Sequence, residues 1–340
     1  MNFIIIITLY LVTSYVLKKS IKYFKNPILL DVPSERSNHN TPKPKCAGLI
    51  LVPLILITTL LVFHVENILN YHWLIIFGFC TILAILSFLD DIKNVSSGIR
   101  LVFQVFCVFS SLFLLDDQLE IFKKSFDFLN FFESIPILQN SLILLLLVFL
   151  WVWIINMFNF MDGMDGITTV QVSALAILTN LLALLGFIEV HFIYFGLILL
   201  TVFLSFFTVN KPPAKIFLGD VGSIPIGFLV GFIIIYNMIK SDLIIPFLII
   251  IMYYLLDSII TLVLRFCNKE NIFKAHSGHF YQKIIRKGYS HDFVLAKIIY
   301  INIILFLLAI LSLYLPLISL GLALLSTSLL LTFFGTRKSK

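Results

Sequence analysis

Long apolar runs separated by short polar segments recur along the whole chain. A helix needs roughly 20 residues with few charges to cross the hydrocarbon core of a bilayer. We read eleven runs as spans: about residues 2–17, 47–63, 73–89, 101–115, 141–155, 168–187, 192–209, 224–239, 243–264, 293–313 and 316–334. The pattern predicts an all-α, polytopic integral membrane bundle of about 11 transmembrane helices.

Composition supports this reading, because 60% of the 340 residues are hydrophobic and only 12% are charged, against about 25% charged in soluble domains. The first run is expected to be a retained helix rather than a cleaved signal, since Lys18 and Lys19 follow it where a cleavage site would lie. The four cysteines form no CxxC pair, which argues against a disulfide framework or a zinc cluster.

The distribution of basic residues predicts the orientation. If the N-terminus faces outward, all of the 24 Lys and Arg except Lys123, Lys124 and Lys240 lie in cytoplasmic loops and flanks. The positive-inside rule therefore predicts an N-terminus outside and a C-terminus inside. The net charge of +6 follows from this topology and needs no nucleic-acid partner.

Five polar clusters fall on the predicted cytoplasmic side, and charged or amide groups at membrane depth usually mark a functional surface. We expect one membrane-embedded domain over residues 1–340, with its active site facing the cytoplasm of a bacterial inner membrane. Its active-site loops are expected near residues 18–46, 90–100, 156–167, 210–223 and 265–292.

Two adjacent carboxylates, Asp90 and Asp91, close the third predicted span. They repel each other and lie at the negative pole of a helix. A metal ion, a lysine or a proton must offset them, which is typical of a working site.

The segment 156–166 is predicted to join two spans, and its amides, carboxylates and glycines suit a hard cation such as magnesium. The EF-hand spacing is absent. Residues 217–223 lead into the next span, with Ser223 as the expected N-cap and Pro225 in the first turn. A glycine-containing helix N-terminus favours phosphate, Asp220 can carry a metal, and Lys211 and Lys215 precede it.

His276 and His279 could share one helical face, but no third zinc ligand lies nearby in the sequence. Their basic surroundings favour contact with phosphate oxygens, with a solvated basic loop as the alternative. Asp257 lies inside a predicted span and needs a partner. It either faces the site or bonds to a neighbouring helix.

Together these clusters resemble the polyprenyl-phosphate N-acetylhexosamine-1-phosphate transferases of glycosyltransferase family 4, relatives of the phospho-MurNAc-pentapeptide transferase of peptidoglycan synthesis. The resemblance covers about residues 31–286. It rests on Asp31-Val32-Pro33 with Arg36 and His39, Asp90-Asp91, Arg100 with Gln104, Asn156-x-x-Asn159-x-x-Asp162-Gly163-x-Asp165-Gly166, Leu218-Gly219-Asp220-x-Gly222-Ser223 and His276-x-x-His279. The first motif departs from the family by ending in Lys45-Cys46-Ala47-Gly48.

The resemblance implies a magnesium-dependent phosphotransferase, with manganese as an alternative ion. It implies Asn159 and Asp220 as metal ligands. The implied catalytic residues are Asp90, Asp91, Asp162 and Asp165. The implied substrate-binding residues are Arg36, His39, Asn156, Lys215, Gly219, Gly222, His276 and His279.

The implied reaction moves an N-acetylhexosamine 1-phosphate from a UDP-sugar to polyprenyl (undecaprenyl) phosphate and releases UMP, which starts a lipid-linked glycan such as O-antigen or teichoic acid. The partners are then that lipid, the UDP-amino sugar and membrane lipids, with a homodimer left open. The His-x-x-His pattern is unlike the three adjacent histidines of the muramyl-peptide branch, which stays the alternative activity. A secondary transporter is the rival of another class, although transporters place such residues near the bilayer midplane.

Overall fold

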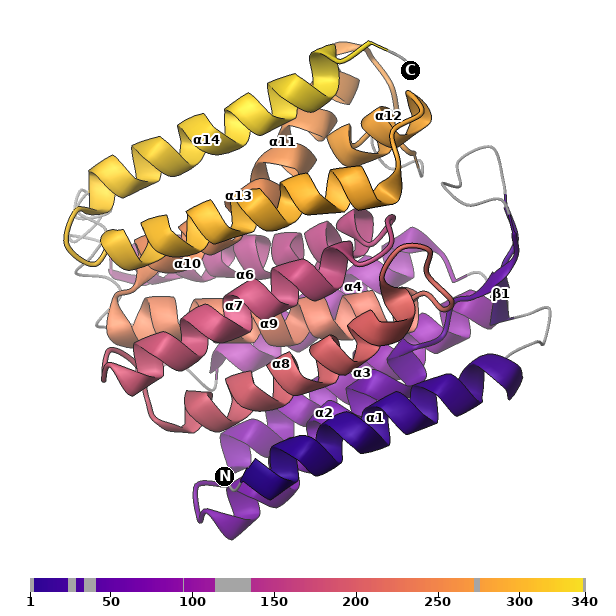
Figure 1. Cartoon of the computed structure of the whole chain (residues 1–340). Coiled ribbons are helices and arrows are strands. Elements are labelled where there is room, and N and C mark those ends of the chain that lie inside the picture. Colours follow the sequence, from indigo (N-terminus) through magenta and orange to yellow (C-terminus); the bar gives the residue numbers. More distant parts are fainter. Residues whose placement is uncertain are drawn as a thin grey trace.

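The computed structural model of the chain is a bundle of long helices lying side by side (Figure 1). It describes residues 3–338 except 24–28, 34–40, 94, 114–135 and 272–275. The first helices are α1 (Phe3–Tyr23), α2 (Gly48–Val65), α3 (Tyr71–Lys93), α4 (Ser97–Phe113), α6 (Pro136–Met161), α7 (Ile167–Leu184) and α8 (His191–Asn210). They are followed by α9 (Asp220–Ser241), α10 (Ile244–Ile250), α11 (Met252–Cys267), α12 (Phe280–Arg286), α13 (His291–Leu311) and α14 (Pro316–Thr336).

The all-α polytopic membrane fold is confirmed. Within the described residues, nine helices are long and apolar enough to cross a bilayer, and the bent pair α10–α11 makes a tenth. The apolar helix α4 has 17 residues, about 25 Å at 1.5 Å per residue. Each predicted apolar run coincides with one helix or, for residues 243–264, with the bent pair.

The expectation of one continuous span over 243–264 is wrong. α10 and α11 meet at an angle of 70°. At the break, the side-chain amide of Gln171 on α7 donates to the carbonyl of Ile250 at 2.9 Å. A side chain that satisfies a backbone carbonyl in this way allows the helical ladder to be interrupted inside the membrane.

Two predicted helix boundaries are also corrected. α6 continues to Met161, so Asn156 and Asn159 lie on a helix and not in a loop between spans. α9 begins at Asp220 with Gly219 as its N-cap, so Ser223 is not the cap. Gly219 has φ 75° and ψ 168°, a backbone conformation that glycine adopts without the clash of a Cβ atom.

α9 is the central helix, and 18 of its 22 residues are buried. The indole of Trp151 on α6 stacks on Phe228 with ring centroids 5.1 Å apart, and its Nε1 donates to the Phe228 carbonyl at 2.9 Å. Gly231 makes this close packing possible, because a Cβ atom there would lie 2.2 Å from Trp151.

The two ends of α9 carry different polar groups. At its last turn, Lys240 pairs with Glu189 at 2.9 Å, and Glu189 also contacts His191 at 3.0 Å and accepts from the Tyr236 hydroxyl at 3.0 Å. The His191 contact, together with Lys240 and Tyr236, lowers the pKa of Glu189 to about 2. This ion cluster ties α8 to the end of α9 opposite Asp220.

A short antiparallel strand pair, β1 (Leu30–Asp31) and β2 (Lys43–Pro44), precedes α2. The chain after β2 pairs with the segment before α9: Phe217 N donates to the Pro44 carbonyl at 2.7 Å, and Gly48 N donates to the Leu218 carbonyl at 3.0 Å. These backbone bonds fix Lys45 beside the start of α9.

The packing at Gly231 predicts that alanine lowers stability at this position but is tolerated at Gly321. Gly231→Ala forces a methyl group into Trp151, and overpacking costs about 1–3 kcal/mol. Gly321→Ala on α14 is the matched control, because a Cβ there meets no described atom within 4 Å and alanine favours a helix by up to about 1 kcal/mol. We expect the thermal midpoint of unfolding in nanodiscs to fall for Gly231→Ala and to hold or rise for Gly321→Ala. An equal midpoint for both variants would contradict this packing.

Candidate active site

Asp90 and Asp91 at the end of α3 each have a basic partner. Arg100 Nη1 lies 2.7 Å from Asp90 Oδ2, and Lys45 Nζ lies 2.8 Å from Asp91 Oδ1. Burial alone would lower the pKa of Lys45, but the hydrogen bond to Asp91 and the charges of Asp91, Asp220 and Asp31 together outweigh that effect and raise it. The repulsion predicted for the carboxylate pair is therefore offset by two cations from two other segments.

The start of α9 lies against the same cations. Arg100 Nη1 also approaches Asp220 Oδ2 at 3.5 Å, so one guanidinium bridges the carboxylates of α3 and α9. A Cβ atom on Gly219 would lie 2.0 Å from the Lys45 carbonyl, and one on Gly48 would lie 2.3 Å from Gly222. The glycines at this helix start thus allow the loop that carries Lys45 to lie directly on it.

The C-terminal turn of α6 supplies two amides. Asn159 Nδ2 donates to Asp220 Oδ1 at 2.8 Å and to Ser223 Oγ at 3.0 Å. Asn156 lies three residues earlier, on the same side of the helix, and donates to Gln104 Oε1 at 2.7 Å. The two amides therefore join α6 to α9 and to α4.

Asp162 follows α6 directly and accepts from Thr168 Oγ1 at 2.5 Å. Burial raises the pKa of Asp162 to about 8, the nearby charge of Asp220 adds to the rise, and the Thr168 hydrogen bond opposes it. This carboxyl is therefore largely protonated at neutral pH in the free protein.

Asp165 has different neighbours. It is 3% exposed, accepts from Ala214 N at 2.9 Å and pairs with His291 at 3.3 Å. Burial favours a higher pKa for Asp165, but the contact with His291 and its charge, the hydrogen bond from Ala214 N and the charge of Lys43 together outweigh it and lower the pKa. These contacts join the loop before α9 to α13, whereas its predicted catalytic role stays a prediction.

The two histidines differ in their surroundings. His279 is 2% exposed, and its Nδ1 lies 3.0 Å from Oδ1 of the fully buried Asp257. A carboxylate partner holds the proton on Nδ1 and leaves Nε2 for a second contact. Burial lowers the pKa of His276 to about 4, so this ring is neutral near pH 7. Asp257 thus bonds to the neighbouring segment, which is one of the two alternatives left by the sequence.

The remaining predicted residues divide into two groups. Lys215 is exposed on the loop before α9. Arg36 and His39 lie outside the described residues. The contacts of Arg100 and Asn159 bring Asp90, Asn159 and Asp220 together, with Asp91 next to Asp90, and the charge of Asp220 also acts on Asp162. Asp165 instead contacts Ala214 and His291.

Arg100 and Lys45 both contact the acidic centre, although no role was expected for either from the sequence. The position of Arg100 in the sequence could have indicated a carboxylate partner. It lies in the first turn of α4, where a cation is unfavourable next to the positive pole of the helix. A nearby carboxylate could therefore have been expected.

Within the described part of the chain, no three His, Cys, Asp or Glu side chains are close enough to hold a metal ion by themselves. The residues that fit a hard cation are instead one amide and one carboxylate, Asn159 and Asp220, in direct contact. Magnesium typically takes one or two carboxylates and completes its shell with water and phosphate oxygens. The donor set is therefore compatible with magnesium bound together with a phosphate substrate.

The balance of charged side chains at the site also favours a bound cation. Among the described residues, Asp90, Asp91 and Asp220 face the two cations Lys45 and Arg100, which leaves an excess of one negative charge. A divalent cation would reverse this excess and allow anionic substrates to approach.

Comparison with known proteins confirms the family resemblance. The model of Glycosyl transferase family 4 matches residues 73–238. The phospho-N-acetylmuramoyl-pentapeptide-transferase of Rickettsia prowazekii (strain Madrid E) is 26% identical over 239 residues, 63% of this chain and 64% of the relative. That of Buchnera aphidicola subsp. Acyrthosiphon pisum (strain 5A) is 26% identical over 82% of both chains.

A relative with a different printed activity also matches. The probable undecaprenyl-phosphate N-acetylglucosaminyl 1-phosphate transferase of Bacillus subtilis (strain 168) is 25% identical over 77% of this chain and 71% of the relative. The chain spans about 64% of the length of the Rickettsia relatives that it matches. Both kinds of relative are phosphosugar transferases by name.

The buried pair of Asp257 and His279 predicts a loss of stability on neutralisation. Asp257 Oδ1 accepts from His279 Nδ1, from Phe280 N at 3.1 Å and from Thr261 Oγ1 at 3.2 Å. Asp257→Asn replaces charged hydrogen bonds by weaker ones and should cost about 1–3 kcal/mol. The measurement is the thermal midpoint of unfolding in nanodiscs. Asp292→Asn, at an exposed carboxylate, is the control, and equal midpoints would show that Asp257 does not hold this segment.

Proposed function

Because the chain is related to glycosyl transferase family 4, we propose that it transfers an N-acetylhexosamine 1-phosphate from a UDP-sugar to polyprenyl phosphate and releases UMP. The observation that carries the proposal is the contact of Asn159 with Asp220 at 2.8 Å, beside carboxylates that pair with Arg100 and Lys45 among the described residues. Such a group at the edge of a membrane bundle suits a reaction between a phosphate on a lipid and a diphosphate from water.

The proposed metal site consists of Asn159 and Asp220. The Asn159 amide donates to Asp220, and a half-turn about its terminal bond would present its oxygen instead. Magnesium bound there would screen the repulsion between the two anionic substrates and the charge that builds on the leaving UMP. The nearby Arg100 and Lys45 supply further positive charge.

The reaction needs little proton chemistry. A lipid phosphate oxygen forms a bond to the β-phosphorus of the UDP-sugar, and the bond from that phosphorus to the bridging oxygen breaks, so that UMP leaves. A phosphate monoester has a second pKa near about 6 and is largely dianionic at neutral pH. Asp90 and Asp91 would therefore act mainly by placing Arg100 and Lys45, since phosphoryl transfer depends on in-line positioning and electrostatic stabilisation.

Two sugar nucleotides are candidate donors for the proposed reaction. The His276-x-x-His279 pattern favours a UDP-N-acetylhexosamine, in agreement with the name of the Bacillus relative. The Rickettsia and Buchnera relatives favour UDP-MurNAc-pentapeptide as the second candidate. A panel that contains both donors separates the two.

The first test measures UMP release by the protein in nanodiscs with undecaprenyl phosphate, the donor panel and magnesium. We expect turnover with at least one donor, its loss with a chelator and its return with magnesium or manganese. Asp220→Asn keeps the shape of the side chain but removes a ligand charge, and should lower kcat by at least about a hundredfold.

Asp292→Asn is the control for that variant, because Asp292 is an exposed carboxylate at the start of α13. It should keep wild-type turnover. UMP absent with every donor would refute the transferase, and full activity of a folded Asp220→Asn would refute the metal site while leaving the transferase in place.

We also propose that the site faces the cytoplasm. In the structure, α3 separates the loop after α2 from the loop before α4. Reporter fusions in the 64–72 and 90–100 loops should therefore give signals from opposite sides, with the 90–100 loop inside because basic flanks are retained there. Signals from the same side would show that α3 does not cross the membrane.

A further inference from the structure

The hydroxyl group of Tyr281 joins the start of α12 to the end of α6. It donates to the carbonyl of Phe160 at 3.1 Å and accepts from the backbone amide of Gly163 at 3.1 Å. A helix leaves its last four carbonyls without partners inside the helix, and Phe160 is the last residue but one of α6. One side chain therefore satisfies an end carbonyl of α6 and an amide of the loop that follows it.

These two hydrogen bonds, which we call the Tyr281 clamp, enclose the turn that carries Asp162. Asp162 lies between the two backbone groups that the hydroxyl binds, and its own amide donates to the carbonyl of Asn159 at 3.3 Å. The side chain of Asn159 in turn donates to Asp220 at 2.8 Å. The clamp therefore acts on the turn that presents both Asp162 and Asn159 to the acidic centre.

Gly163 fits closely against the clamp. A Cβ atom on Gly163 would lie 2.3 Å from the Tyr281 hydroxyl oxygen and 3.0 Å from Gln282 Nε2. Gly163 is not one of the glycines with a positive φ, so any residue could adopt its backbone conformation. The contact with Tyr281, and not backbone strain, is therefore what requires a glycine at this position.

Tyr281 is itself held in place from α11. Oδ1 of the fully buried Asp257 accepts from Phe280 N at 3.1 Å and contacts His279 Nδ1 at 3.0 Å. The Tyr281 ring stacks on His279 with ring centroids 5.9 Å apart. Burial raises the pKa of Tyr281 far above its usual range, so the hydroxyl keeps its proton for the Phe160 carbonyl. The clamp thus connects the end of α6 to a fixed point on α11.

Resting on the proposed function, we propose that Tyr281 is a positioning residue for the transfer reaction, whose hydroxyl fixes the end of α6 so that Asp162 and Asn159 keep their places at the reacting phosphates. Tyr281 is fully buried and acts through these two residues. A displacement of about 1 Å at a reacting centre can lower a rate by up to about a hundredfold. A hydroxyl that served stability alone would leave the turnover of the folded protein unchanged.

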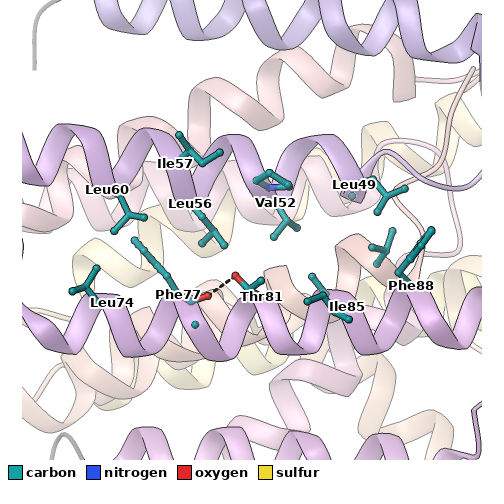
Figure 2. A pocket seen from close by; sticks show the side chains of 15 residues that line it. Leu49, Val52, Leu56, Ile57, Leu60, Leu74, Phe77, Thr81, Ile85 and Phe88 are labelled. Carbon is teal, nitrogen blue, oxygen red and sulfur yellow. Dashed lines mark hydrogen bonds between the residues drawn. The ribbon is translucent and has the colours of Figure 1, made fainter.

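The apolar groove between α2 and α3 is separate from the clamp. Figure 2 shows the side chains of the two helices facing each other across this groove. Its lining comes from α2, α3 and Val221, and it includes neither Tyr281 nor residues 160–163. A change at Tyr281 therefore leaves the groove walls intact, and its effect on turnover reports on the end of α6.

Tyr281→Phe removes the hydroxyl and keeps the ring. Tyr253→Phe is the matched control, because Tyr253 is also fully buried and its hydroxyl has no hydrogen-bond partner among the described residues. The thermal midpoint of Tyr281→Phe in nanodiscs should fall by no more than a few degrees. Both variants are assayed well below their midpoints, so that each is folded.

In the assay of UMP release, Tyr281→Phe should lower kcat about tenfold and change the KM for undecaprenyl phosphate and for the UDP-sugar by less than about twofold. Tyr253→Phe should match the wild type. A kcat for Tyr281→Phe equal to that of Tyr253→Phe would overturn the positioning role. A loss confined to KM would also overturn it, because the hydroxyl would then support binding and not the placement of reacting groups.

Gly163→Ala tests the same contact from the other side. Its methyl group displaces the Tyr281 hydroxyl, so this variant should lower kcat about as much as Tyr281→Phe does. In the double variant the methyl group meets no hydroxyl, and the two losses should therefore not add in free energy. Losses that multiply in kcat would show that the two residues act independently and would overturn the clamp.

Amide hydrogen exchange tests the clamp without turnover. The Gly163 amide donates to Tyr281, so peptides that cover residues 157–166 should exchange faster in Tyr281→Phe than in the wild type or in Tyr253→Phe. Equal exchange in all three proteins would overturn the clamp. Faster exchange in Tyr281→Phe, combined with no UMP release by the wild type from any donor, would refute the transferase and support the clamp.

Discussion

The excess of carboxylates over cations at the start of α9 is the constraint on which the site depends. Asp90, Asp91 and Asp220 come from two helices and share Arg100 and Lys45. Bringing these charges together near the membrane costs free energy, and the fold offsets the cost with ion pairs and with the Asn159 amide. An arrangement that stabilised the bundle alone would have no need of the acidic excess.

The packing of α9 positions this arrangement. Its body is buried against α6, where Trp151 both stacks on Phe228 and bonds to its carbonyl, and its far end is held by the Glu189 ion cluster. The first turn, which carries Asp220, is therefore a fixed point against which the loop of Lys45 and the end of α6 are placed. The site lies on the ends of packed helices, which hold side chains more precisely than free loops do.

Hydropathy was sufficient to predict the order of the long apolar helices, because a bilayer admits only helices with satisfied backbones, whereas nine or ten of the eleven predicted spans meet the length needed to cross a bilayer in the described part of the chain. It could not predict the break at Ile250, which depends on an amide from α7 reaching that carbonyl. Asn159 was expected in a loop and Ser223 at a helix cap for a similar reason: the sequence does not show that Asn159 donates to Ser223 between two helices.

Topology was sufficient to predict that the site residues lie at one end of the bundle, since all the polar clusters fall on one side of the predicted spans. It was not sufficient to predict which side chains contact each other. Pairing depends on the rotation of each helix about its axis. Rotation directs Arg100 towards both Asp90 and Asp220, while the contacts of Asp165 are with Ala214 and His291. Two aspartates three residues apart in one motif thus have separate surroundings, and the pKa of Asp162 rises while that of Asp165 falls.

The path of the chain around α9 also links the acidic centre to the lipid phase. The backbone bonds of Gly48 and Phe217 join the start of α2 to the start of α9, so the polar loop that carries Lys45 continues directly into an apolar helix. The close approach of Gly48 to Gly222 places this junction against the first turn of α9. Polar and apolar surfaces of the protein thus meet at one helix junction.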